Sequence, residues 1–511
     1  MMPVDYEISA PKPCALVESL RSVGYSLPTA IADIVDNSIA AHAKNVWIDF
    51  HWAGPDSWIS IVDDGDGMTE ATLTDAMRPG SANPLDSRKP DDLGRFGLGL
   101  KTASFSQCRK LSVWSRCAEG SAAGRCWDLD YVANHDEWRL LKVAAPRRLE
   151  PFNHLIGLRS GTLVLWEQLD RAVDNSPSSS AEAHQRFLQL IDDVHAHLAM
   201  IFHRYLEGTA SARRGALRIS VNGRSEAHAV QPWNPFAISG APSSKETPTE
   251  AMSFNGHRVS VRGYVLPHKD RLSQEQLQAG SGPQGWVAQQ GFYIYRNDRI
   301  IVPGDWLRLG RGRPWAKEEQ YKLARLSVDI PNVMDEDWGL DIKKSTARPP
   351  AAIRERLTDL AEAVRKDARQ LFAHRGEYGP RPDAPKAVIE RPWTAISRSG
   401  RNVYVINRKH PLIAQVLCRL GTLVEHVKPM LRLIEETVPV ERIWLDAAES
   451  PDSHALPYEG QDEGTVLADI RLARNYLAES LKTRESLRTY LLATEPFRRF
   501  PHLVDRAIQE M

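Results

Sequence analysis

AIADIVDNSIAA, residues 30–41, is the stretch that decides the fold and the function of this chain. Its apolar residues recur at the spacing of an amphipathic helix, so much of this helix is expected to be buried. Asp33 and Asn37 are four residues apart, and side chains at that spacing share one face of a helix. A carboxylate and a carboxamide that project together suit a general base beside a metal-bound phosphate. The pair is also compatible with a solvated helix face, so its role depends on the residues downstream.

The next stretch with chemical character is DDGDGM, residues 63–68. It follows two apolar segments, 46–50 and 58–62, which are expected to pair as antiparallel strands. A carboxylate at the end of a strand, Asp63, is followed here by glycines at alternate positions. Backbone of this kind approaches a flat ligand closely while the carboxylate accepts a hydrogen bond from an amino group. An acidic turn is the alternative, whereas a calcium loop is excluded because the spaced ligands are incomplete and the closing Glu is missing.

A glycine-rich segment, LGRFGLGLKTAS, occupies residues 93–104. It follows a short capped helix expected at 69–77 and a loop, 78–90, that is long enough to act as a lid. The glycines open an apparent helix, where free backbone N–H groups and the helix N-terminus favour phosphate oxygens. Lys101 and Thr102 would add a charge and a hydroxyl group. The spacing matches neither a Rossmann fingerprint nor a P-loop.

The composition fits a soluble protein with several domains. A chain of 511 residues is too long for one ordinary hydrophobic core. Its 65 basic and 65 acidic residues give a formal net charge of +0. This balance argues against a general nucleic-acid coat protein and leaves room for a local basic surface. The five cysteines are scattered without a C-x-x-C pair, which indicates reduced thiols rather than a disulfide framework or a zinc site. We find no signal-like N-terminus and no long apolar run, so we expect no membrane contact and a cytoplasmic location.

Taken in order, the helix at 30–41, the Asp-x-Gly-x-Gly box and the glycine-rich segment resemble the GHKL ATP-binding superfamily of gyrase, Hsp90, histidine kinases and MutL. Together with GYS at residues 24–26, these motif sequences are most similar to those of prokaryotic MORC-like and MutL-like ATPases. The resemblance implies an α+β fold, with a Bergerat-type ATP-binding sandwich followed by a transducer-like (S5-like) α/β domain and a mostly helical C-terminal module. The expected parts are an ATP-binding domain at 1–210, a transducer-like domain at 211–375, a proline-rich linker at 376–395 and the C-terminal module at 396–511.

The same resemblance implies roles in binding ATP and Mg²⁺. Asn37 would coordinate Mg²⁺, and Asp63 would bind the adenine amino group. A later Gly-Thr element, SGTLVLW at 160–166, puts Thr162 at the start of a strand, where it would support the adenine through water or through the Asp63 carboxylate. The other residues implied to hold the nucleotide are Gly65, Gly67 and Met68 at the adenine and Gly94, Phe96, Gly97, Leu98, Gly99, Leu100, Lys101 and Thr102 at the triphosphate.

Two further roles implied by the resemblance concern catalysis. Hydrolytic relatives usually carry Glu as the general base, whereas this chain has Asp33, whose side chain is one methylene shorter. Because a base must lie within about 3 Å of its water, the shorter side chain predicts slow turnover or binding without turnover. In relatives a transducer lysine reaches the γ-phosphate. WGLDIKKST, residues 338–346, lies where that loop is expected, so Lys344 or Lys343 is the candidate.

The second half of the chain combines strand and helix signals. Asn297 and Asp298 between two apolar segments predict a tight hairpin. Helices are expected at 182–206 and 351–364, and strands are expected at 217–221, 258–265, 291–295, 299–302 and 326–330. Beyond the linker, a strand at 402–406 and helices at 412–420, 426–436 and 465–481 predict a module for partner proteins or self-association.

WLRLGRGRPWAK, residues 306–317, is a basic loop with flanking tryptophans. Arg308, Arg311 and Arg313 would contact the phosphates of duplex DNA, and the tryptophans would stack on bases. An exposed loop with nothing bound is the alternative.

Together these features predict an ATP-hydrolysing conformational switch or clamp. By resemblance, lid closure over ATP would promote a homodimer, and the client would be DNA, in a restriction or phage-defence setting. An ATP-binding scaffold with little turnover and an Hsp90-like chaperone are the alternatives. A histidine kinase is disfavoured, because no histidine precedes His42 to act as a phosphoacceptor upstream of the helix.

Overall fold

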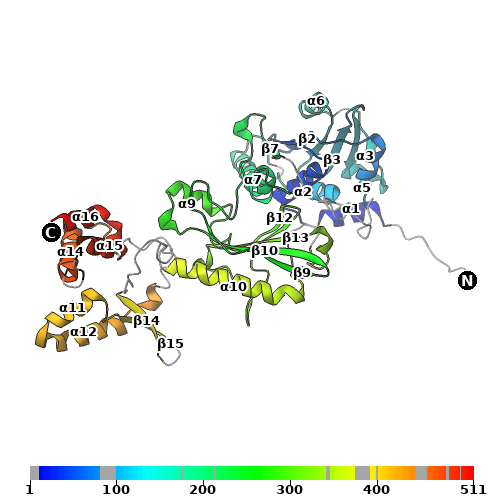
Figure 1. Cartoon of the computed structure of the whole chain (residues 1–511). Helices are drawn as coiled ribbons and strands as arrows, with labels where there is room; N and C mark the ends of the chain where they lie inside the picture. Colours follow the sequence, from blue (N-terminus) through cyan, green and yellow to red (C-terminus); the bar gives the residue numbers. More distant parts are fainter. Residues whose placement is uncertain are drawn as a thin grey trace, which may run out of the picture. The chain divides into compact units, whose positions relative to one another are not determined.

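The computed structural model describes residues 11–22, 24–80, 99–144, 146–173, 176–211, 215–340, 346–373, 392–398, 401–443, 457–478, 481, 483–494 and 496–510. The chain divides into two units, Met1–Glu377 and Tyr378–Met511. Figure 1 labels their helices and strands. Helices and largely antiparallel sheets occur together in the first unit, which confirms the predicted α+β class.

A seven-stranded sheet forms the first half of unit Met1–Glu377, in the order β5-β4-β3-β6-β2-β1-β7. All its pairs are antiparallel except β1 with β7. Apolar residues of β2 alternate between the two faces, because Ile59 and Ile61 join one core while Trp58 and Val62 join another. The strands are β1 Asn45–His51, β2 Trp58–Asp63, β3 Lys110–Arg116, β4 Ala123–Asp128, β5 Leu141–Lys142, β6 Gly161–Glu167 and β7 Arg218–Val221.

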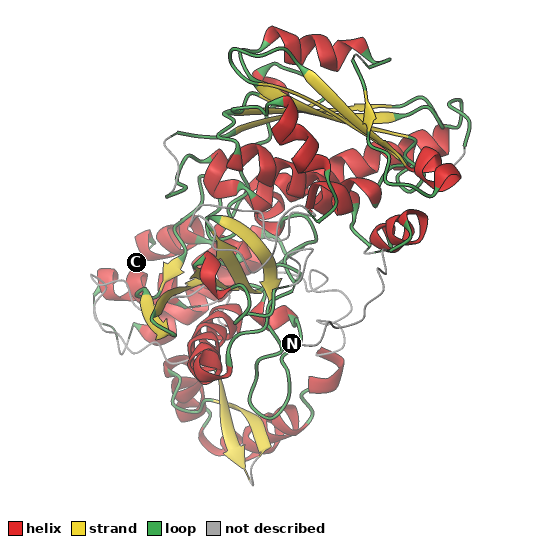
Figure 2. Ribbon diagram, turned by 90° about the vertical axis from the view of Figure 1, so that its right-hand side faces the viewer, coloured by secondary structure: helices red, strands yellow, loops and turns green. Residues whose placement is uncertain are grey.

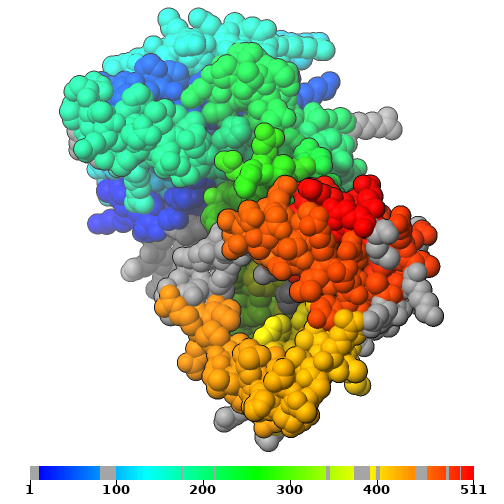
Figure 3. All heavy atoms as spheres, turned by 90° about the vertical axis from the view of Figure 1, so that its left-hand side faces the viewer, coloured from blue at the N-terminus to red at the C-terminus, as the bar shows by residue number. Residues whose placement is uncertain are grey.

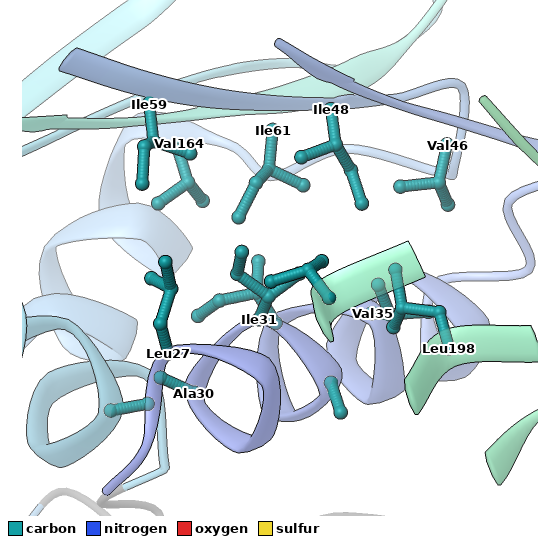
Figure 4. Close-up of a cluster of buried hydrophobic side chains, with 14 of the residues drawn as sticks. Leu27, Ala30, Ile31, Val35, Val46, Ile48, Ile59, Ile61, Val164 and Leu198 are labelled. Carbon is teal, nitrogen blue, oxygen red and sulfur yellow. The ribbon is translucent and has the colours of Figure 1, made fainter. Parts of the chain in front are cut away.

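Helices cover both faces of this sheet (Figure 2). The larger core lies between the sheet and α2, whose Leu27, Ala30, Ile31 and Val35 face the strands in Figure 4. The opposite face packs against α6 through Leu155. The helices are α1 Pro13–Arg21, α2 Leu27–Ala40, α3 Glu70–Met77, α4 Gly99–Phe105, α5 Leu129–His135, α6 Leu149–Gly157, α7 Ala181–Ile201 and α8 His203–Leu206.

A second sheet has the order β12-β11-β13-β10-β8, with β9 also paired to β10. The predicted hairpin at Asn297 and Asp298 is confirmed. Both residues have positive φ, 48° and 62°, as a two-residue turn between twisted strands requires. α10 packs on β10 and β13. The elements are β8 Lys245–Glu246, β9 Glu250–Phe254, β10 His257–Val265, α9 Gln274–Ser281, β11 Gly291–Arg296, β12 Arg299–Asp305, β13 Ala324–Ile330 and α10 Ala351–Ala373.

Two sequence-based expectations about this unit are wrong in detail. The strand expected at 217–221 to open the second domain is β7, which instead pairs in parallel with β1 at the edge of the first sheet. A strand pattern does not specify its partner, and the free edge of β1 supplies one here. The helix expected at 182–206 is interrupted at Phe202, between α7 and α8. The division into domains at 210 and 211 stays a prediction, although β7 extends the first sheet past that point.

Unit Tyr378–Met511 contains a small hairpin and several helices. Its core lies among α14, α15 and α16, which are orange to red in Figure 3. Trp393, expected in the linker at 376–395, begins β14, and residues 376–391 of that region lie outside the described residues. Within the described residues, no helix combines the length and the apolar character needed to cross a membrane. The elements are β14 Trp393–Arg398, β15 Arg401–Ile406, α11 Pro411–Arg419, α12 Val424–Glu436, α14 Glu463–Leu477, α15 Arg484–Ala493 and α16 Pro501–Gln509.

Candidate functional site

Helix α2 carries the two polar residues that were singled out in the sequence. Its first turn is fixed by Ser26, whose Oγ accepts from the Thr29 backbone N–H at 3.4 Å. The two polar side chains differ in environment, because Asp33 is 4% exposed while Asn37 is exposed to solvent. The helix therefore presents a protected carboxylate and, one turn later, an accessible carboxamide.

The Asp33 carboxylate contacts a phenol and a guanidinium. The Tyr25 hydroxyl donates to Oδ2 at 3.0 Å, and Arg299 Nη2 lies 3.7 Å from Oδ1. Burial, together with the Asp33 charge, holds the pKa of Tyr25 well above its ordinary value, so Tyr25 remains a donor. Gly99, at the start of α4, lies on the Oδ2 side, and a Cβ placed there would be 3.8 Å from Oδ2. The end of the glycine-rich segment thus adjoins the predicted base.

Asp63 ends β2 in a buried pocket of hydrogen-bond donors. Its Oδ2 accepts from Ser38 Oγ at 2.9 Å, and its Oδ1 accepts from the Gly65 backbone N–H at 2.9 Å. Burial is the main reason that the pKa of Asp63 is raised to about 6. Thr162, on β6, is its partner across the strands. The carboxylate is therefore fixed in orientation by groups from α2 and from the Asp-x-Gly-x-Gly loop.

The backbone of this loop requires glycine at Gly67. Its φ is +71°, and a Cβ there would lie 1.9 Å from the Arg116 carbonyl oxygen. The next residue, Met68, donates its backbone N–H to Ser115 Oγ at 2.9 Å, and Ser115 Oγ is also 2.9 Å from Thr162 Oγ1. Ser115 therefore connects the loop to Thr162. Sequence reasoning missed both Ser115 and Ser38, since a serine in a strand or a helix carries no motif of its own.

The glycine-rich segment is only partly described. Gly94, Phe96, Gly97 and Leu98 lie outside the described residues, as do Lys343 and Lys344. Gly99, Leu100, Lys101 and Thr102 lie on α4, which packs against α2.

Lys101, expected at the triphosphate, lies in a buried position. It is 2% exposed, and its Nζ donates to the Ala76 carbonyl oxygen at 2.8 Å, near the end of α3. Burial lowers the pKa of Lys101 to about 8. In this arrangement the lysine joins α4 to α3, the helix that precedes the predicted lid.

A cavity of about 520 Å³ lies on another side of the Asp-x-Gly-x-Gly loop. Its lining includes Met68, Glu70, Arg125 and Lys142. Of the residues predicted at the adenine, Met68 belongs to this lining and Asp63 does not.

Part of the basic loop at 306–317 is in contact with helix α10 of the same unit. Arg311 pairs with Asp359 at 2.8 Å and with Glu362 at 3.1 Å, both on α10. Trp306 is 2% exposed, and the guanidinium of Arg365 lies 4.6 Å from its ring centre and 4.5 Å from that of Trp315. The expectation that Trp306 stacks on bases is therefore wrong, because the ring is buried. Arg308 and Arg313 are exposed.

The polar groups at Asp63 and Asn37 are of the types that an amino-bearing ligand and a divalent cation require. A buried carboxylate held by fixed donors suits an exocyclic amino group. The accessible oxygen of the Asn37 carboxamide is a ligand type that Mg²⁺ accepts.

Comparison with known proteins agrees with this geometry. Residues 25–162 match the family model of histidine kinase-, DNA gyrase B-, and HSP90-like ATPases. The match runs from Tyr25, which donates to Asp33, to Thr162, which faces Asp63. A curated relative, the ATPase morc-1 of Caenorhabditis elegans, is 32% identical over 83 residues, which are 16% of this chain and 9% of that protein. Residues 25–162, less than half of the chain, are therefore similar to the ATPase domains of the GHKL type found in histidine kinases, gyrase B and HSP90.

Proposed function

We propose that this chain is a Mg²⁺-dependent ATPase that works as a conformational switch. The observation that carries the proposal is the buried Asp63 carboxylate, held by Ser38 and Gly65, in the same sandwich as the Asp33 and Asn37 helix. Each Asp63 oxygen accepts one of these hydrogen bonds, and a carboxylate oxygen has two acceptor sites. The adenine amino group would use the remaining capacity.

The phosphate end of the proposed site combines Asn37, Asp33 and the start of α4. Asn37 would hold Mg²⁺, which when bound neutralises charge on the phosphates. Gly99 and Leu100, which are half-buried, would lie against the phosphates with the glycines that precede them, whereas Thr102 is 1% exposed and would support the start of α4 from within. Asp33 would accept a proton from the attacking water through whichever oxygen reaches it.

A switch that binds ATP without turning it over is the second candidate. The observation that favours it is the engagement of Asp33, since Tyr25 donates to one oxygen and Arg299 lies beside the other. These groups occupy part of the acceptor capacity that an attacking water would use. Binding and phosphate release, measured on the same preparation, separate the two candidates.

Asn37→Ala is expected to weaken Mg²⁺-ATP binding by about tenfold or more, because the cation loses an oxygen ligand. The side chain is exposed at the end of a helix whose packing lies on the other face, so the thermal midpoint is expected to stay near the native value. Isothermal titration with ATP, with and without Mg²⁺, measures the effect. Asn134→Ala, another exposed asparagine on a helix, is the matched control. Equal affinities in the two variants would remove Asn37 from the metal site.

We also propose that ATP binding promotes a homodimer and that duplex DNA is the client. Exposed Arg308 and Arg313 support a phosphate contact, whereas Arg311 is already paired with α10. If DNA binds there, Arg308→Ala with Arg313→Ala is expected to reduce DNA affinity and its salt dependence, while Arg311→Ala has the smaller effect. Fluorescence anisotropy with a labelled duplex at several salt concentrations measures this. DNA binding that is unchanged in the double variant would exclude the loop.

A further inference from the structure

Arg299 connects the second sheet to the helix of the predicted base. It begins β12, directly after the Asn297–Asp298 turn, and is 3% exposed. Its Nε donates to Asp36 Oδ1 at 3.0 Å, and its Nη2 lies 3.7 Å from Asp33 Oδ1. One guanidinium therefore contacts two carboxylates of α2 that lie almost one turn apart, which matches the planar fork of arginine.

Because these three charged groups are buried, the contact between them is costly to break. Asp33 and Asp36 are 4% and 2% exposed, so water screens their attraction to Arg299 very little. Surface ion pairs form and break with little consequence, but a buried charge that loses its partner is strongly unfavourable. Helix α2 and Arg299 are therefore expected to keep their relative position or to separate as a discrete event.

Helix α8 contacts the hairpin that carries Arg299. The Tyr205 hydroxyl donates to the Asn297 carbonyl oxygen at 2.6 Å, and Arg204 Nη1 donates to Asp298 Oδ1 at 3.0 Å. These contacts fix the two turn residues directly before Arg299. A displacement of the hairpin therefore moves the Arg299 backbone with it.

We propose that Arg299 is a positioning residue that sets the orientation of Asp33. Through this contact, the position of the β11–β12 hairpin is coupled to the geometry of the ATP site. The proposal rests on the proposed function, with Asp33 as the base. Tyr25 donates to one carboxylate oxygen and Arg299 faces the other, so both bear on the rotation of the side chain. With an aspartate as base, whose reach is one methylene shorter than that of a glutamate, this rotation decides whether water is within reach.

A shift of the hairpin would also change the charge around Asp33. When Arg299 withdraws, Asp36 and Asp33 lose a shared cation, and α2 is left with two neighbouring buried carboxylates. Motion of the second sheet and the state of the nucleotide site are thereby coupled in both directions, because a coupling free energy between two sites is reciprocal.

The test compares Arg299→Gln with Arg325→Gln in the full chain. Arg325, on β13, is also a buried arginine, 1% exposed, but its guanidinium donates to the carbonyl oxygens of Pro235 and Gly280. The two variants lose the same charge from buried positions of one sheet. We expect kcat in Arg299→Gln to be about 100-fold below that of Arg325→Gln, with affinity for a non-hydrolysable ATP analogue equal within about threefold.

Amide hydrogen exchange gives a readout that does not need turnover. The amides of α2 are expected to exchange about tenfold faster in Arg299→Gln than in Arg325→Gln. Adding Asp36→Asn to Arg299→Gln removes one of the two buried carboxylates that lost the shared cation, so folding stability should recover in part while kcat stays low.

Equal kcat and equal α2 exchange in the two single variants would overturn the inference, and so would recovery of kcat together with stability in the double variant. A native chain that binds ATP but shows no turnover contradicts the proposed hydrolysis. In that case, faster amide exchange of α2 in Arg299→Gln still supports the inference that Arg299 stabilises the position of this helix. Unchanged exchange overturns that inference.

Discussion

Asp33→Asn is expected to lower kcat for ATP hydrolysis by about 10²–10⁴-fold, the range that a general base contributes, and to leave ATP affinity within about threefold. Asparagine keeps the size of the side chain and can still accept from Tyr25 through its carbonyl oxygen. It cannot take a proton from water. The loss should therefore fall on kcat rather than on binding.

The measurement is steady-state phosphate release, with ATP binding measured separately by titration. Asp170→Asn is the matched control, because Asp170 also pairs with a buried arginine, Arg21, in the same unit and belongs to neither α2 nor the Asp63 loop. Tyr25→Phe removes only the hydroxyl donor and should cost less than Asp33→Asn. If Asp33→Asn releases phosphate at the native rate, the base lies elsewhere; if the native chain binds ATP without release, the binding-only switch is correct.

The elements around Asp33 were predictable because their signals are local. Helical spacing in residues 30–41, the strand before Asp63 and the glycines after it are each encoded within a few neighbouring residues. The hairpin at Asn297 and Asp298 was predictable for the same reason, since a two-residue turn depends on its own φ angles.

The partners of the site were not predictable, because they depend on distant segments meeting in space. Arg299 lies 263 positions from Asp36 in the chain, and the sequence around it reads only as the start of a strand. Ser115 and Ser38 become informative only when β3, β6 and α2 are placed together. The same limit explains β7: its apolar pattern predicts a strand, but its partner is decided by the free edge of β1.

Trp306 illustrates a second kind of limit. A tryptophan beside arginines and glycines reads as an exposed ring ready to stack on a base. In the structure, Arg365 of α10 lies over that ring, so the aromatic surface is already used by the chain itself. The sequence between them gives no sign of this pairing.

Asp63→Asn is expected to weaken ATP binding by about 10- to 100-fold and to stabilise the fold at neutral pH. The affinity falls because an amino group loses a charged acceptor, a hydrogen bond that contributes about 1.5–3 kcal/mol. Stability rises because burial has raised the pKa of Asp63 from 3.8 to about 6. Between these values the folded chain holds a proton that the unfolded chain has released, so the free energy of unfolding falls as pH rises.

The difference in pKa, about 2 units, corresponds to about 3 kcal/mol once pH exceeds 6, and Asp63 is 6% exposed, so solvent screening reduces this little. Asparagine carries no charge, so the variant should exceed native stability by about that amount near pH 8 and match it near pH 4. Urea unfolding across this pH range measures the difference.

Asp64→Asn is the control for the Asp63 prediction. The neighbouring Asp64 accepts from the Lys44 and Asn45 backbone N–H groups at 2.7 Å. Loss of its charge should destabilise the fold without changing the affinity for ATP. A pH-independent gain in Asp63→Asn would refute the buried-charge explanation, and unchanged ATP affinity would remove Asp63 from the adenine site. If both effects occur as expected, the chain keeps an unstable carboxylate at this position because ATP requires it, a trade of stability for binding that no packing argument accounts for.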